Sequence, residues 1–328
     1  MKKIFIAILA VAAFAACATE DTIVTPKGQA IAFGDAFVDN STKAIYEEAD
    51  DIQGFTVFGN VVATANVATA TPVALYGDNG ATVTRGDAEL GVAWDCDVIR
   101  YWTPSCTFNF AAIANHNGVT VQNGIPTAIK YTVANDDTND LIYGVAAATT
   151  DASCQPSGSV NSNKVVAFTM EHLLSRVQLS FANGVNTADK AYSYAISNIT
   201  VSTWEKGIYT IGTPTPWAKD GENSVNLTYA NVDAVAEGAT VASTTANVVI
   251  PGSSVTVSFN YELKLNGATI CNGTVSGTIP SDVTLQKGHS YNLKAELTLE
   301  NEIQFTVSDD DDNSLAAWTS PATEVTVE

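Results

Sequence analysis

The sequence predicts an all-β protein built from antiparallel sheets that pack as sandwiches. Short segments of alternating apolar and polar residues recur along the chain, with clusters of Gly, Pro, Asn and Ser between them. Such alternation is typical of strands that bury one face. Patterns with the helical period are nearly absent, and the 46% of apolar residues is enough to fill a sizeable core. Antiparallel sandwiches are the architecture that these observations favour.

The chain begins with a segment that is typical of an export signal and ends in a cysteine. Two lysines precede the apolar run Ile4–Ala16, and Cys17 follows it. This run of 13 residues is short for a membrane-spanning helix, which needs about 20. We therefore expect residues 1–16 to be removed as a signal peptide. A cysteine at this point is the residue that bacterial lipoproteins acylate, which predicts lipid anchoring at Cys17. The alternative is an ordinary secretory signal.

Residues 17–30 lack periodicity and are expected to form a tether. The strands predicted after it lie at residues 31–38, 54–58, 107–110, 129–133, 141–143, 165–168, 176–181, 196–201, 247–250, 255–261, 291–299 and 303–307. Pro, Gly, Ser and Asn cluster at 154–163, which predicts a linker. A mature chain of about 310 residues favours two domains. We place the first at 31–158 and the second at 159–328.

The chain is strongly acidic, with 15 basic and 35 acidic residues and a formal net charge of −20. Loss of the signal peptide removes two lysines and no acids, which makes the charge −22 (13 minus 35). Such a charge repels nucleic acid and anionic lipid, so nucleic-acid binding is excluded. Charged residues are only 15% of the chain, well under the usual quarter. This composition is typical of extracellular β-proteins.

Four cysteines follow Cys17: Cys96, Cys106, Cys154 and Cys271. An exported chain meets an oxidising compartment, and four cysteines allow three pairings. We expect a disulfide between Cys96 and Cys106, because they are close enough in sequence to face each other across a turn. Unpaired buried thiols are the alternative. The chain has no CxxC motif, which disfavours redox or zinc chemistry.

The sequence contains none of the common motifs that indicate a catalytic site. It has three histidines but no HExxH, GxSxG, P-loop or GxGxxG motif. We expect no catalytic residues, no cofactor and no metal; an enzyme with dispersed carboxylates is a distant alternative. His172 follows a strand and is expected to be a half-buried structural residue. The run Asp309–Asp312 lacks the Gly and Glu of a calcium loop, so it predicts a solvated acidic turn.

Several short patches follow one another in a specific order. They are Trp94, Arg100–Pro104, Thr107–Ala112, Asp140–Tyr143, Phe168–Val177, Val249–Gly252 and Lys287–Leu293. Together they resemble the fimbrillin family of Bacteroidetes, which comprises pilus subunits and related cell-surface lipoproteins. The resemblance implies two tandem transthyretin-like β-sandwiches. It also implies a structural role as stalk, tip or anchor subunit of a fimbria that supports adhesion, held at the outer membrane by its lipid.

The resemblance further implies assembly by strand exchange. A trypsin-like surface protease cuts such proteins after a basic residue near the start, the first strand leaves, and a neighbouring pilus subunit fills the groove. The matching site here is Lys43-Ala44. Family members often carry arginine at this position, and an arginine-specific protease would not cut after lysine. Implied partners are other pilus subunits, the lipoprotein export machinery, this protease, and a host or bacterial surface ligand.

The strand to be displaced is predicted from its apolar face, which carries Ile31, Phe33 and Phe37. Removing these side chains would expose an apolar groove, and a neighbour's extended segment could fill it by β-augmentation. The donor is predicted in residues 315–328, with Trp318, Val325 and Val327 as the groove-filling side chains.

The alternative function is a non-polymerising surface lipoprotein that binds glycan or a host ligand through exposed aromatic residues. Trp217 follows Thr213-Pro-Thr-Pro216, which predicts a loop tip with an exposed indole.

Overall fold

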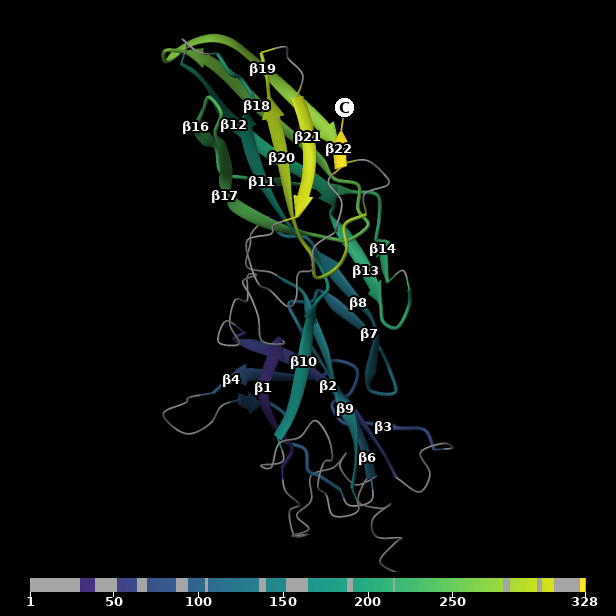
Figure 1. Ribbon diagram of the computed structural model, residues 1–328. Coiled ribbons are helices and arrows are strands. Elements are labelled where there is room, and N and C mark those ends of the chain that lie inside the picture. Colours follow the sequence, from purple (N-terminus) through teal and green to yellow (C-terminus); the bar gives the residue numbers. More distant parts are fainter. Residues whose placement is uncertain are drawn as a thin grey trace, which may run out of the picture.

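Figure 1 shows the computed structural model of the protein, an elongated molecule composed of β-strands. The structure describes residues 30–38, 52–63, 70–86, 94–103, 106–135, 140–151, 165–187, 191–214, 216–279, 284–299, 303–309 and 325–327. The regular secondary-structure elements in these ranges are all β-strands, which confirms the all-β class. Within them, no helix has the length and apolar character that a membrane crossing requires.

The N-terminal half contains an eight-stranded sheet with the order β1-β10-β9-β6-β2-β4-β5, and β3 pairs with β2 beside this path. Its strands are β1 (Ala32–Val38), β2 (Gly54–Ala63), β3 (Val73–Ala74), β4 (Ala81–Arg85), β5 (Trp94–Cys96), β6 (Cys106–Ala114), β9 (Ile142–Asp151) and β10 (Val165–His172).

The central strands of this sheet are buried on both faces. In β2, Phe55 and Val57 belong to a core within the N-terminal half, whereas Phe58 belongs to a second core that continues into the C-terminal half. In β6, Phe110 and Ile113 divide between the same two cores. Because side chains alternate across a strand, β2 and β6 separate the two cores.

The C-terminal half contains two packed sheets. One has the order β17-β11-β20-β21-β22; the other has the order β15-β12-β18-β19, with β16 paired to β12. Phe181 of β11 and Phe259 of β18 meet edge to face across the sandwich, with ring centroids 5.0 Å apart. These strands are β11 (Ser175–Asn183), β12 (Tyr192–Trp204), β15 (Ser224–Thr228), β16 (Val232–Ala236), β17 (Thr240–Val249), β18 (Thr256–Leu265), β19 (Ala268–Thr278), β20 (Ser290–Leu297), β21 (Ile303–Asp309) and β22 (Val325–Val327).

A four-stranded sheet joins the two halves. Its order is β14-β13-β8-β7, formed by β7 (Gly118–Gln122), β8 (Ile125–Thr132), β13 (Lys206–Thr210) and β14 (Trp217–Lys219). The strands β8 and β13 come from opposite halves and pair antiparallel, with Tyr131 opposite Gly207. In Figure 1 these strands lie at the waist of the molecule. The core beneath them includes residues of both halves, so the two halves share one apolar interior.

Two features of the sheets differ from the sequence prediction. The pairs β1–β10 and β11–β20 are parallel, whereas antiparallel pairing was expected throughout. Alternation reveals which face of a strand is buried but not the direction of its neighbour, so the sequence pattern could not show this. In addition, the predicted boundary at residue 158 lies too early. The strand β10 follows that boundary, yet it pairs with β9 and β1 of the N-terminal sheet.

Candidate functional site

The strand β1 is the first strand in the order of the N-terminal sheet. Besides its neighbour β10, the chain at β1 contacts the segment that follows β5, the last strand in that order. On one side it runs parallel to β10, with Phe33 opposite Val166. On the other side, the Ile31 N–H donates to the Arg100 carbonyl oxygen at 2.8 Å, and Ala30 forms a bridge with Tyr101. The backbone of residues 30–38 therefore fills the space between β10 and the segment that follows β5.

The side chain of Phe33 occupies an aromatic slot in the N-terminal core. It is 5% exposed. Its ring centroid lies 6.1 Å from those of Phe110 and Phe168, and 6.4 Å from those of Phe55 and Tyr76. Four rings from three other strands and one loop thus surround a single side chain of β1. We call Phe55, Tyr76, Phe110 and Phe168 the aromatic slot.

In the strand that was predicted to be displaced, the apolar pattern put Ile31 and Phe33 on the buried face. Both side chains are buried. Phe37 lies in β1, but its side chain falls outside the described residues. Between these positions Gly34 approaches β10 closely, because a Cβ added there would lie 2.6 Å from Val165 Cγ1. A strand that replaces β1 in the same register needs a glycine at this position or a shift of Val165.

The C-terminal strand β22 lies at the other end of the molecule. It pairs antiparallel with β21, with Val325 opposite Val307 and Val327 opposite Phe305. It is the last strand of its sheet. Trp318 lies outside the described residues. In this structure the predicted donor residues Val325 and Val327 thus extend a sheet of their own chain.

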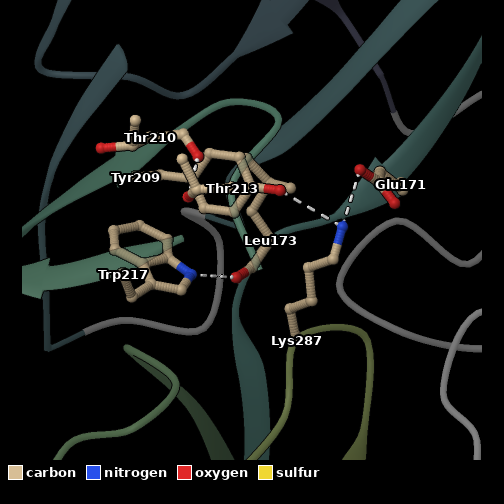
Figure 2. Close-up of polar contacts among 7 residues, drawn as sticks. All are labelled: Glu171, Leu173, Tyr209, Thr210, Thr213, Trp217 and Lys287. Carbon is tan, nitrogen blue, oxygen red and sulfur yellow. Dashed lines mark hydrogen bonds and ion pairs between the residues drawn. The ribbon is translucent and has the colours of Figure 1, made fainter. Parts of the chain in front are cut away.

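Figure 2 shows polar contacts between the two halves, made by Glu171, Leu173, Tyr209, Trp217 and Lys287. Lys287 Nζ lies 2.8 Å from Glu171 Oε1 and donates to the Tyr209 hydroxyl at 3.3 Å. Trp217 Nε1 donates to the Leu173 carbonyl oxygen at 2.8 Å, and its ring meets that of Tyr209 edge to face. We call Glu171, Leu173, Tyr209, Trp217 and Lys287 the waist cluster.

Electrostatics favour a charged Lys287. Burial lowers the pKa of the Lys287 ammonium, but the hydrogen bond and the charge of Glu171, together with Tyr209, outweigh burial and raise this pKa above its usual value. The ammonium also lies 5.7 Å from the centroid of the Tyr209 ring. Because Lys287 precedes β20 and Glu171 lies in β10, this contact connects the C-terminal sandwich to the N-terminal sheet.

A buried pair of a histidine and a carboxylate lies at the end of β10. His172 Nδ1 donates to the carboxylate of Asp140, and both side chains are fully buried. The Asp140 carbonyl oxygen accepts from Asn115 Nδ2 at 2.8 Å. The first contact joins the residues before β9 to the end of β10, and the second joins the segment after β6 to Asp140. His172 was expected to be a half-buried structural residue; its side chain is fully buried.

The predicted disulfide between Cys96 and Cys106 is wrong, because both side chains are thiols. The sheet explains why they do not meet. Cys96 pairs with Val83, which pairs with Phe55, whereas Cys106 pairs with Ala63. Phe55 and Ala63 are eight positions apart on β2 (63 minus 55), which corresponds to about 26 Å along a strand. A disulfide requires Cα atoms within about 7 Å.

Trp217 is likewise not the exposed platform that the proline-rich segment predicted. It lies in β14, is half-buried, and packs on the shared core. A Cβ added at Gly207 would lie 3.0 Å from the Trp217 ring, so the indole covers the neighbouring strand closely. The position of this ring could not be predicted, because its partners Leu173 and Tyr209 are distant in sequence.

Several predicted sites lie outside the described residues: Cys17, Lys43, Ala44 and Cys154. Sequence reasoning did not find the waist cluster, although Glu171 and Lys287 lie within patches that carry the family resemblance. Nothing in their spacing shows that they pair. In the part of the chain that the structure describes, no group of three or more His, Cys, Asp or Glu side chains could hold a metal ion.

The chain is similar to one protein family and to several solved structures. A family model described as fimbrillin-like matches residues 42–309. A crystal structure of a fimbrial protein from Bacteroides vulgatus ATCC 8482 is similar in fold, with a TM-score of 0.57 and 15% identity over 81% of this chain and 93% of that chain. The fimbrial anchor protein Mfa2 from Porphyromonas gingivalis matches with a TM-score of 0.36 and 9% identity, over 88% of this chain and 99% of that chain. No curated protein matches the chain.

Proposed function

The chain belongs to the fimbrillin-like family, and on that premise we propose that it is a structural subunit of a cell-surface fimbria assembled by strand exchange. Membership makes it a fimbrial or adhesion-related surface protein with a structural role. The finer proposal is that β1 is the strand that leaves, and that a neighbouring subunit supplies its replacement as stalk, tip or anchor.

The observation that supports this proposal best is the position of Phe33 in the aromatic slot. The strand β1 is terminal in its sheet, yet its inward side chains complete a core. Loss of the strand would expose four aromatic rings and the unpaired backbone of β10. Burial of one large apolar side chain contributes about 1.5–3 kcal/mol, so an open slot favours capture of another extended segment.

The proposed donor is the C-terminal segment 315–328. Trp318 is an aromatic residue of a size suited to the aromatic slot, while Val325 and Val327 are suited to the adjoining apolar face. The donor has no glycine, so the close approach at Gly34 requires Val165 to move or the register to shift. The proposed trigger is cleavage after Lys43 by a trypsin-like surface protease. The cut would release Cys17, the tether and β1 together.

Limited trypsin treatment of the full-length protein tests the proposal. We expect a new N-terminus at Ala44, followed by polymers that resist heating in detergent. Lys27 provides a matched control, because a cut there removes the anchor but leaves β1 in place. The variant Lys43→Gln should therefore be cut at Lys27 and form no heat-resistant polymer.

A second variant tests the donor. Deletion of residues 315–328 should leave a folded protein that is cut after Lys43 but forms no polymer. Polymers formed by this deletion would refute the donor assignment. A protein that is cut after Lys43, releases β1 and forms no heat-resistant polymer would refute strand exchange altogether. That result would favour a non-polymerising surface lipoprotein that binds glycan or a host ligand.

A further inference from the structure

The strand β19 forms a long open edge of the C-terminal sandwich. It spans Ala268–Thr278 and, among the residues that the structure describes, pairs only with β18. Its single irregularity lies near the start, where the register shifts between Leu263 and Lys264 of β18. Residues 271–278 therefore present a regular row of backbone N–H and C=O groups to the outside. Figure 1 shows the strand at the end of the molecule remote from β1.

This edge lacks the features that normally prevent strands from pairing with other chains. Exposed edges are usually protected by charged residues or proline, and β19 contains neither. The strand carries no charged residue, although the chain has a net charge of −20. Two copies of such a protein repel each other in most orientations, but they can approach edge to edge at β19 without placing like charges opposite each other.

The facing sheet also ends in a long uncharged strand, β17, but side-chain hydrogen bonds cover that edge. These hydrogen bonds connect β17 to residues 228–230. Ser243 Oγ donates to the Ala230 carbonyl oxygen, the Ala230 N–H donates to Thr245 Oγ1, and Asn247 Nδ2 donates to the Thr228 carbonyl oxygen. Among the residues that the structure describes, one uncharged edge is therefore covered by side-chain hydrogen bonds of the chain itself, and the other pairs with no further strand.

The outward face beside β19 is a ladder of hydroxyl and amide groups. Thr278 bonds Thr256 at 2.9 Å, Ser276 bonds Ser258 at 2.9 Å, and Thr274 donates to Asn260 Oδ1 at 2.8 Å. Cross-strand Thr and Ser pairs of this kind stabilise sheets. A further strand with Thr, Ser and Asn on the same face would continue the ladder, and β19 itself is such a strand.

The inward face of β19 is complementary to itself. Cys271 and Val275 pack against the shared core and alternate with Gly273 and Gly277. Consider two copies of β19 that pair antiparallel about a two-fold axis at Thr274. The numbers of two residues that lie opposite each other then add up to 548 (twice 274). Val275 then faces Gly273, and Cys271 faces Gly277. Every large inward side chain meets a glycine, and Ser276 meets Asn272 on the outward face.

We propose that β19 is a homotypic interaction surface, through which two copies of this chain pair antiparallel and join their sandwiches into one continuous sheet. Such an isologous contact closes as a dimer. It involves neither β1 nor β22 and does not depend on strand exchange.

Site-specific disulfide formation tests the pairing and its register. In the full-length Gly277→Cys variant, oxidised glutathione should link Cys271 of one copy to the introduced thiol of the other, and peptide mapping identifies this link. Residues 271 and 277 are six positions apart on one strand, about 20 Å, so the link cannot form within a copy.

The full-length Val275→Cys variant is the matched control. Its introduced thiol faces Gly273 of the other copy, so no link to Cys271 should form. A link between Cys271 and the thiol introduced at position 275 would refute the register. The absence of a link in both variants would refute the pairing.

Sedimentation of the Lys43→Gln background, in which β1 cannot be released by a cut at that site, separates this proposal from strand exchange. We expect a concentration-dependent dimer. Thr274→Lys places two ammonium groups opposite each other and should weaken the dimer by about tenfold or more. Asn226→Lys, on β15 at the other side of the same sheet, should leave it unchanged. A monomer at all concentrations, or equal effects of the two lysines, would refute the proposal.

Discussion

Phe33 of β1 stacks on Phe168 of β10, with ring centroids 6.1 Å apart and 20° between the ring planes. The two strands run parallel, and their rings close one side of the N-terminal core. The contact explains how a terminal strand can help to complete a core. It also gives the first test of whether β1 belongs to the stable fold.

Phe33→Ala should lower the free energy of unfolding by about 3–5 kcal/mol, because it leaves a cavity among four rings. Urea unfolding of the full-length protein measures the loss. Ala32→Ser is the matched control, since Ala32 is exposed on the opposite face of the same strand and should change stability by less than about 0.5 kcal/mol. Similar stabilities for the two variants would contradict the packing of Phe33.

Two side-chain pairs lie at the end of β10: the buried pair of Asp140 and His172, and the exposed pair of Glu171 and Lys287. Substitution of the acid should lower the free energy of unfolding much more in the buried pair than in the exposed one. Asp140→Ala removes the acceptor of a fully buried histidine and should cost about 3–5 kcal/mol. Glu171→Gln removes the charge that faces Lys287, but these side chains are 53% and 35% exposed, so its cost should stay below about 1 kcal/mol. Urea unfolding compares the two. A larger loss from Glu171→Gln would reverse this ranking.

Trp217→Phe should destabilise the protein even though it preserves an aromatic ring. The Leu173 carbonyl oxygen would lose its indole donor, and an unsatisfied buried acceptor costs about 1–3 kcal/mol. Thermal unfolding measures the effect, and Ala218→Ser on the exposed side of β14 serves as the control. An unchanged melting temperature for Trp217→Phe would show that the hydrogen bond contributes nothing to the waist cluster.

Alkaline pH should unfold the protein through its buried tyrosines. Burial raises the pKa of Tyr143 and Tyr194 from 10.0 to about 12. Above about pH 10 the unfolded chain releases tyrosine protons that the folded chain retains, so stability is complete below pH 10 and decreases as the pH rises toward 12. Unfolding free energies across this range should fall steadily. Tyr194→Phe should make the fall shallower, and an unchanged slope would count against its burial.

Much of the strand content could be predicted from the sequence, because alternation is a local property of consecutive residues. The pattern around residues 31–38 identified a strand with Ile31 and Phe33 on its buried face, and both are buried. Likewise, 176–181 and 255–261 were predicted as strands, and Phe181 and Phe259 of these segments meet across the sandwich. The patches in their fixed order also indicated the family.

The sequence by itself therefore determined the all-β class, many of the strands and, at positions such as Ile31 and Phe33, which side chains turn inward. Only the tertiary structure decided which strands become neighbours. It made β1 parallel to β10, buried both faces of β2 and β6, and separated Cys96 from Cys106. It brought Trp217 to Leu173 and left β19 without a second partner in the described sheets. The physical reason is that pairing and two-sided burial depend on segments far apart in the chain, whose meeting no local pattern records.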